Sequence, residues 1–179
     1  QILTLKYLKD GLIELPNGLL QCLYLQTYTV NMILQEALDK FLEKETTKNK
    51  SEVPWLIWLM ENPKSPIHLH GASALNDHDY VHIILDKGQA NDDEAFVIGF
   101  TMGNDDRTKN WEVKLFKFVS SKLYPEEARF TKKQLKIFDE GFKYGQSKLH
   151  LYQRIGEFNW STIDKNTPLN EVKRKFNVQ

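Results

Sequence analysis

The sequence has a single cysteine, no excess of charge of either sign and no long apolar run. One cysteine, Cys22, cannot form a disulfide within the chain, which favours a reducing compartment. Lys plus Arg and Asp plus Glu each number 24, and a chain without a basic excess is not typical of a general nucleic-acid binder. No stretch approaches the ~18 apolar residues of a membrane-spanning helix, and no signal-peptide or transit-peptide pattern is visible. These absences predict a cytoplasmic protein, soluble or peripherally bound to a membrane, without a nucleic-acid partner.

The length of 179 residues suits one domain and leaves little room for two. Folding at this length buries roughly 70% of the surface of the unfolded chain, so a core can form without a disulfide or a metal. Hydrophobic residues make up 41% of the chain and charged residues 27%, which excludes a disordered or collagen-like protein. No repeat, low-complexity tract or linker divides the sequence, and we expect one domain over residues 1–179.

Apolar residues recur at helical spacing through most of the chain. The spacing predicts helices over about residues 29–45, 54–60, 77–87, 91–102, 111–122, 131–149 and 168–176. Asp77 and Gly88 are the expected caps of the third helix, and Asn91 or Asp92 is expected to cap the fourth. The first 28 residues fit short helices or strands, and the helix-rich remainder favours helix. The sequence therefore predicts an all-α, single-domain bundle of six to eight helices.

Two pairs of residues in these helices have more than one interpretation. Gly141 and Gly145 lie four positions apart and let a neighbouring helix or an isoprenoid tail approach closely, with helix packing the commoner reason. Trp55 and Trp58 fit either the core or a membrane surface, where indole rings favour the interface.

Histidines cluster in one part of the sequence: four of the five lie within fifteen positions, at His68, His70, His78 and His82. His78 and His82 are four residues apart on a predicted helix, so both imidazoles project from one face and can reach one ion. Asp79 is adjacent, and Glu94 follows after eleven more residues, at the start of the next predicted helix. Two imidazoles with one or two carboxylates suit zinc, and also accept manganese or ferrous iron.

These residues also have ordinary structural explanations. A pair of histidines one turn apart most often lies on a helix without binding a metal. The acids from Asp77 to Glu94 could simply be residues that favour helix amino termini. From the residues alone, metal binding and helix capping both remain open.

The full pattern, His78-Asp79-x-x-His82 followed by eleven residues and Glu94, resembles the signature of the coenzyme Q biosynthesis protein 4 family. The carboxy-terminal region is similar too: Trp160 is followed by Pro168-Leu169-Asn170-Glu171-Val172-Lys173, where relatives carry a tryptophan and a Pro-Leu-x-x-Val-Arg-type ending. The resemblance covers about residues 77–178, and the four-residue motif is its most specific part. An all-helical fold is what the resemblance implies.

The resemblance implies that His78, Asp79, His82 and Glu94 bind a metal ion, usually zinc, with manganese or iron as alternatives. It implies a role in ubiquinone assembly, in which the C1 carboxyl group of a prenylated hydroxybenzoate is removed and replaced by hydroxyl. It also implies contact with other quinone-biosynthesis proteins at the cytoplasmic side of the inner membrane. Asp79 is the expected catalytic proton acceptor if it does not bind the metal. Zinc performs no redox chemistry, so an oxidative step would need another metal or a partner enzyme.

Three hypotheses about function follow. The first is a metal-dependent, decarboxylase-type lyase, and the second is a non-catalytic scaffold that binds an isoprenoid lipid and organises other enzymes. The third, a metal phosphohydrolase using His78 and Asp79, fits worst because such enzymes need a further histidine and aspartate at other spacings. Enzyme and scaffold both predict an apolar cavity lined partly by the helix from Phe96 to Met102. A homodimer stays an open alternative.

Overall fold

The computed structural model describes residues 6–7, 13–14, 32–45, 69–73, 75–124, 126, 129–152 and 154–178. Within these residues the fold is an all-α bundle, which confirms the predicted class. Its α-helices are α2 (Leu34–Glu45), α4 (Leu75–Ile84), α5 (Asn91–Gly103), α6 (Asn110–Lys122), α7 (Lys132–Lys148) and α8 (Leu169–Phe176). Two 3-10 helices, η2 (Ile155–Glu157) and η3 (Trp160–Thr162), connect α7 to α8.

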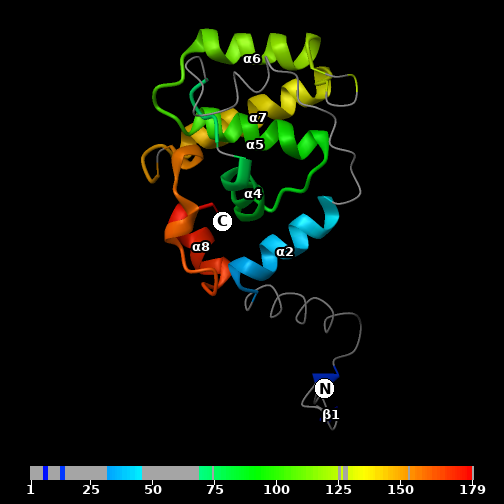
Figure 1. Cartoon of the computed structure of the whole chain (residues 1–179), viewed down its shortest axis with the longest axis vertical. Helices are drawn as coiled ribbons and strands as arrows, with labels where there is room; N and C mark the ends of the chain where they lie inside the picture. Colours follow the sequence, from blue (N-terminus) through cyan, green and yellow to red (C-terminus); the bar gives the residue numbers. More distant parts are fainter. Residues whose placement is uncertain are drawn as a thin grey trace, which may run out of the picture.

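The helices form layers (Figure 1). Helix α6 is the outer layer at one end of the molecule, α5 and α7 lie next to each other in the middle, and α4 follows, with α2 and α8 at the other end. Buried side chains form two clusters, one between α5, α6 and α7 and one between α2, α4, α5, η2, η3 and α8. Helix α5 contributes to both clusters and therefore lies where the two halves of the core meet, and α4 packs in the second of them.

Helices α5 and α7 pack backbone against backbone. A Cβ atom on Gly141 would lie 2.1 Å from the carbonyl oxygen of Phe96, and one on Gly145 would lie 2.2 Å from that of Phe100. Because both contacts advance in the same direction along the two helices, α5 and α7 run parallel. The glycines that permit this are Gly99 and Gly103 on α5 and Gly141 and Gly145 on α7. Packing is thus confirmed as the reason for Gly141 and Gly145, and α7, not a cavity, covers this face of α5.

The end of α4 differs from the prediction. Asp86, with φ 53°, adopts the left-handed conformation that closes the helix, and the N–H of Lys87 donates to the carbonyl of His82 at 2.9 Å. This hydrogen bond is that of a Schellman motif. The prediction of Gly88 as the cap was wrong, because aspartate tolerates the left-handed region and ends the helix earlier.

Two helix starts also differ. Helix α4 begins at Leu75, so Asp77 lies in its first turn and is not the N-cap. Helix α2 begins at Leu34, later than expected, because Ile33 forms an isolated antiparallel bridge with Pro168 near the start of α8. Long-range pairing of this kind leaves no trace in local helical spacing.

At the amino terminus, strands β1 (Lys6–Tyr7) and β2 (Ile13–Glu14) form an antiparallel pair. The expectation of helix in the first 28 residues is therefore wrong at these four positions. The predicted helix over residues 54–60, with Trp55 and Trp58, lies outside the described residues, as do Cys22 and His68.

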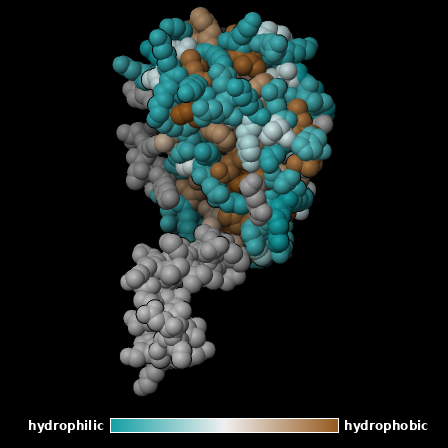
Figure 2. Space-filling view, turned by 180° about the vertical axis from the view of Figure 1, so that it is seen from behind, coloured by the Kyte–Doolittle hydropathy of each residue, from teal (hydrophilic) through white to brown (hydrophobic). Residues whose placement is uncertain are grey.

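The visible surface is mainly hydrophilic, and hydrophobic residues reach it in separate places (Figure 2). Among the described helices, none combines the length and the apolar character that crossing a bilayer requires.

Candidate metal centre

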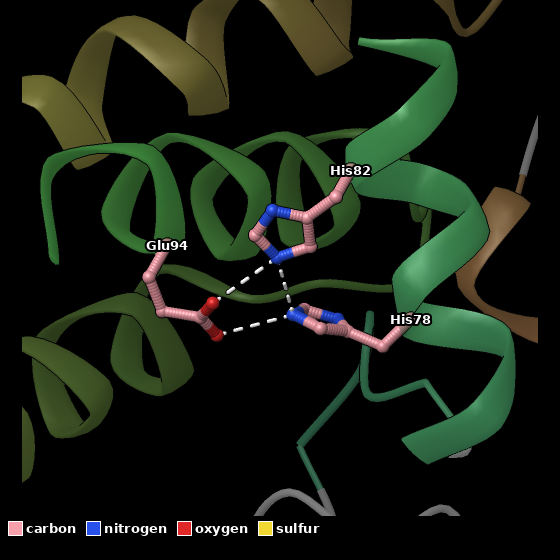
Figure 3. A group of neighbouring side chains, drawn as sticks. All are labelled: His78, His82 and Glu94. Atoms are coloured by element: carbon pink, nitrogen blue, oxygen red, sulfur yellow. Dashed lines mark hydrogen bonds and ion pairs between the residues drawn. The ribbon is translucent and has the colours of Figure 1, made fainter. Parts of the chain in front are cut away.

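Three side chains from α4 and α5 meet at one point (Figure 3). The Nε2 atoms of His78 and His82 are 3.0 Å apart. The Glu94 carboxylate reaches both imidazoles: its Oε1 lies 3.1 Å from Nε2 of His78 and its Oε2 lies 3.1 Å from Nε2 of His82. The structure thus brings together three of the four residues that the sequence predicts as ligands.

Local structure explains this convergence. The two histidines are one turn apart on α4, so they share a face. The chain then reverses between Leu85 and Ala90, and Glu94 lies in the first turn of α5, where its N–H donates to the carbonyl of Ala90 at 2.9 Å. Ala90 is the N-cap and makes no side-chain hydrogen bond, so the predicted caps Asn91 and Asp92 were wrong. Acids in this first turn are favoured by the positive end of the helix dipole.

The spacing of the three donor groups fits a metal ion. Bonds from zinc to nitrogen or oxygen are about 2.0–2.1 Å, so the ligand atoms of a tetrahedral site are about 3.3 Å apart. The Nε2 atoms of the two histidines are 3.0 Å apart, and each lies 3.1 Å from a different oxygen of Glu94, which is within a few tenths of that value; one donor atom from each of the three residues lies within 4.8 Å of the others. The donor set of two imidazoles and a carboxylate also accepts manganese or ferrous iron.

His82 is held by groups outside the ligand set. Its Nδ1 lies 2.7 Å from the carbonyl oxygen of Gly88, so Nδ1–H donates to that oxygen, and Nε2 is the ring nitrogen on the side of the centre. The ring packs against Phe41 of α2 at a centroid distance of 5.4 Å. The amide of Gln89 donates to the carbonyl of Phe41 at 2.8 Å, which ties the α4–α5 loop to α2. Sequence reasoning missed these supports because a backbone carbonyl has no residue-type signature.

The three ligand side chains differ in exposure, and the site opens on the side of Glu94. Exposure is 2% for His82, 19% for His78 and 37% for Glu94. Loss of water around Glu94 would raise its pKa, but the charge and hydrogen bond of His78, together with those of His82, outweigh this effect. The pKa of Glu94 therefore lies well below its usual range, and the carboxylate is ionised at neutral pH, as a metal ligand must be.

Asp79 lies outside the converging group. It is half-buried on α4, but its carboxylate is not among the atoms that come together at the centre. Neighbouring residues on a helix point about 100° apart, which separates Asp79 from the face of His78 and His82. Within the described residues the candidate centre thus consists of His78, His82 and Glu94, and Asp79 is not part of it.

His70, another member of the histidine cluster in the sequence, lies elsewhere. Its Nδ1 is 2.8 Å from Oε1 of Glu112 on α6, and its backbone N–H donates to the same oxygen at 3.2 Å. His70 therefore joins the segment 69–73 to α6.

A pocket of about 290 Å³ is lined by residues of the segment 162–175, which includes part of α8. Its lining includes charged side chains, unlike the apolar cavity predicted along Phe96 to Met102.

Comparison of the chain with protein-family models, with curated proteins and with solved structures finds no match. Any resemblance to the coenzyme Q biosynthesis protein 4 family therefore rests on the motif from His78 to Glu94 and on the carboxy-terminal pattern.

Proposed function

We propose that the protein is a metal-dependent enzyme of quinone biosynthesis, a decarboxylase-type lyase that acts at C1 of a prenylated hydroxybenzoate. The observation that carries the proposal is the convergence of His78, His82 and Glu94 on one point. The convergence of these side chains supports metal binding. The spacing of the motif, through the family resemblance, supports the proposed class of substrate. Zinc is the proposed ion, with manganese or iron as alternatives.

The number of ligands favours an enzyme over a structural metal site. Structural zinc sites usually have four protein ligands, whereas catalytic sites have three and leave a position for water or substrate. Three ligands converge here, and the side of Glu94 is open. Two histidines and one carboxylate are also the ligand set of non-haem iron oxygenases, which would suit an oxidative reaction.

The residues of the chain have distinct roles in the proposed reaction. A bound divalent ion would polarise the substrate's phenolate or carboxylate and stabilise the charge that develops as carbon dioxide leaves. The carbonyl of Gly88 fixes the tautomer of His82. Glu94, ionised by its histidine neighbours, supplies the negative ligand. Asp79 is proposed to take up the proton that a water molecule at the open side of the centre would lose, because it lies next to His78 on α4 without belonging to the converging group.

The alternative is a non-catalytic scaffold that binds an isoprenoid lipid and other quinone-biosynthesis proteins at the cytoplasmic side of the inner membrane. One observation favours it: the ligands lie on two consecutive helices, so a bound ion would clamp α4 to α5. In that case, loss of a ligand should reduce stability and partner binding together.

The proposal is tested by metal analysis of the purified protein together with turnover of a prenylated hydroxybenzoate. Glu94→Gln should lose the metal and the activity. Asp93→Asn removes the same charge from the neighbouring position and should keep both. A variant lacking both His78 and His82 that still complements a quinone-deficient strain would retire the catalytic role and leave the scaffold.

A further inference from the structure

Helix α6 carries an apolar stripe on its outer surface. Trp111 is 57% exposed, Leu115 37% and Phe118 58%, and their spacing of four and three residues places them on one side of the helix. Leu123, directly after the helix, is 48% exposed. These four residues, the α6 stripe, lie on the outermost layer of the bundle (Figure 1).

The one acidic residue in the sequence of α6, Glu112, faces the inside of the protein. Glu112 is buried and accepts hydrogen bonds from the backbone N–H of Lys109 at 2.7 Å and of His70 at 3.2 Å. Oε1 of the same carboxylate lies 2.8 Å from Nδ1 of His70. Because Glu112 is the one acid in the sequence of α6, the outward side of the helix carries no negative charge of its own.

Positive charge accompanies the stripe. Lys109, Lys114 and Lys122 are exposed on or beside α6, and Lys117 is paired with Asp139 of α7. The chain as a whole has a formal net charge of zero, so this positive charge is a local feature of the α6 surface.

We propose that the α6 stripe docks on a membrane surface that contains anionic lipids, with α6 lying in the plane of the interface. Indole and phenyl rings favour the boundary between headgroups and acyl chains, and lysines beside them meet lipid phosphates. An outer helix with a convex apolar stripe fits a bilayer surface, which needs no matching groove. The inference is independent of the metal centre, because no ligand lies on α6.

The test is sedimentation of the full chain with vesicles of phosphatidylcholine and phosphatidylglycerol, and with vesicles of phosphatidylcholine alone. Wild-type protein should bind the anionic vesicles more tightly, and salt should release it. Each lysine near an anionic surface contributes about five-fold to binding, so Lys114→Glu with Lys122→Glu should reduce binding at least tenfold. Trp111→Ser with Phe118→Ser should reduce it by a similar factor.

Matched controls come from exposed residues away from α6. Leu151→Ser changes another exposed leucine, 48% exposed, and Lys143→Glu reverses an exposed lysine on α7; both should bind like wild type. Absence of wild-type binding to either vesicle, or equal losses in the controls, would overturn the proposal. A third result would also overturn it: wild-type protein that does not bind vesicles but forms a dimer in light scattering, with the dimer dissociated by Trp111→Ser with Phe118→Ser. The stripe would then join two copies of the chain.

Discussion

Metal binding to His78, His82 and Glu94 should stabilise the folded protein, because the unfolded chain does not hold the three ligands together. At a free ion concentration one hundred times Kd, binding adds about 2.7 kcal/mol to the free energy of unfolding. For a chain of 179 residues, each kcal/mol raises Tm by about 2–4 °C. The expected increase in Tm is therefore about 5–11 °C.

This increase can be measured by calorimetry on chelator-treated protein to which zinc, manganese or ferrous iron is added separately. Glu94→Gln and His82→Ala should abolish it. Asp93→Asn and His150→Ala are the matched controls, since they alter an acid and an exposed histidine outside the centre, and they should retain the increase. A wild-type Tm that responds to none of these ions, or a Glu94→Gln variant that responds normally, would refute the reasoning.

Three further predictions concern contacts around and beyond the centre. Gly145→Ala should lower the free energy of unfolding in urea by about 1–3 kcal/mol although alanine is the better helix former, because its Cβ would lie 2.2 Å from the carbonyl oxygen of Phe100. Gln89→Ala should weaken metal affinity about tenfold in calorimetric titrations, because it cuts the tie between the α4–α5 loop and α2. Burial raises the pKa of Asp105, but the hydrogen bonds and charge of Arg107 lower it below its usual value. Asp105→Asn should therefore destabilise the protein at neutral pH, and its deficit in urea unfolding should shrink as the pH falls below about 4, where protonation removes the stabilisation from wild type.

Each of these predictions has an outcome that contradicts it. Gln146→Ala, on the exposed side of α7, should change stability by less than about 0.5 kcal/mol, so a Gly145→Ala protein more stable than this control would show that the helices separate freely. Equal metal affinity in Gln89→Ala and wild type would remove the supporting role of the loop. A deficit of Asp105→Asn that stays constant across the acid range would contradict the ion pair.

Local spacing was sufficient to predict much of the fold and three members of the centre. Helical periodicity predicts the bodies of α2 and α4 to α8, and the four-residue step from His78 to His82 fixes both imidazoles on one face. Glu94 needs only a chain reversal between two adjacent helices. The position of Asp79 depends on a rotation of about 100° around one helix, which the motif alone does not resolve.

Features that depend on distant partners could not be predicted. Residues 111–122 contain two stripes at helical spacing, and the stripe that faces inward is the one with the acid Glu112, not the one with Trp111. Burial of Glu112 is possible because His70, 42 positions earlier, and two backbone N–H groups satisfy its carboxylate. Likewise, Asp86 ends α4 and turns the chain, so that the carbonyl oxygen of Gly88 accepts a hydrogen bond from His82. Residue types do not reveal this contact, because it depends on the path of the backbone.

The ligands of the centre are close in sequence as well as in space. His78 and Glu94 are 16 positions apart, whereas the packing of α5 against α7 must wait for a segment that begins beyond residue 130. Closing the shorter loop loses less chain entropy, and contacts between near neighbours in sequence form faster. We therefore expect the α4–α5 hairpin to assemble early in folding, so that an ion captured there would hold α5 in place while the later helices, α6 to α8, dock onto it.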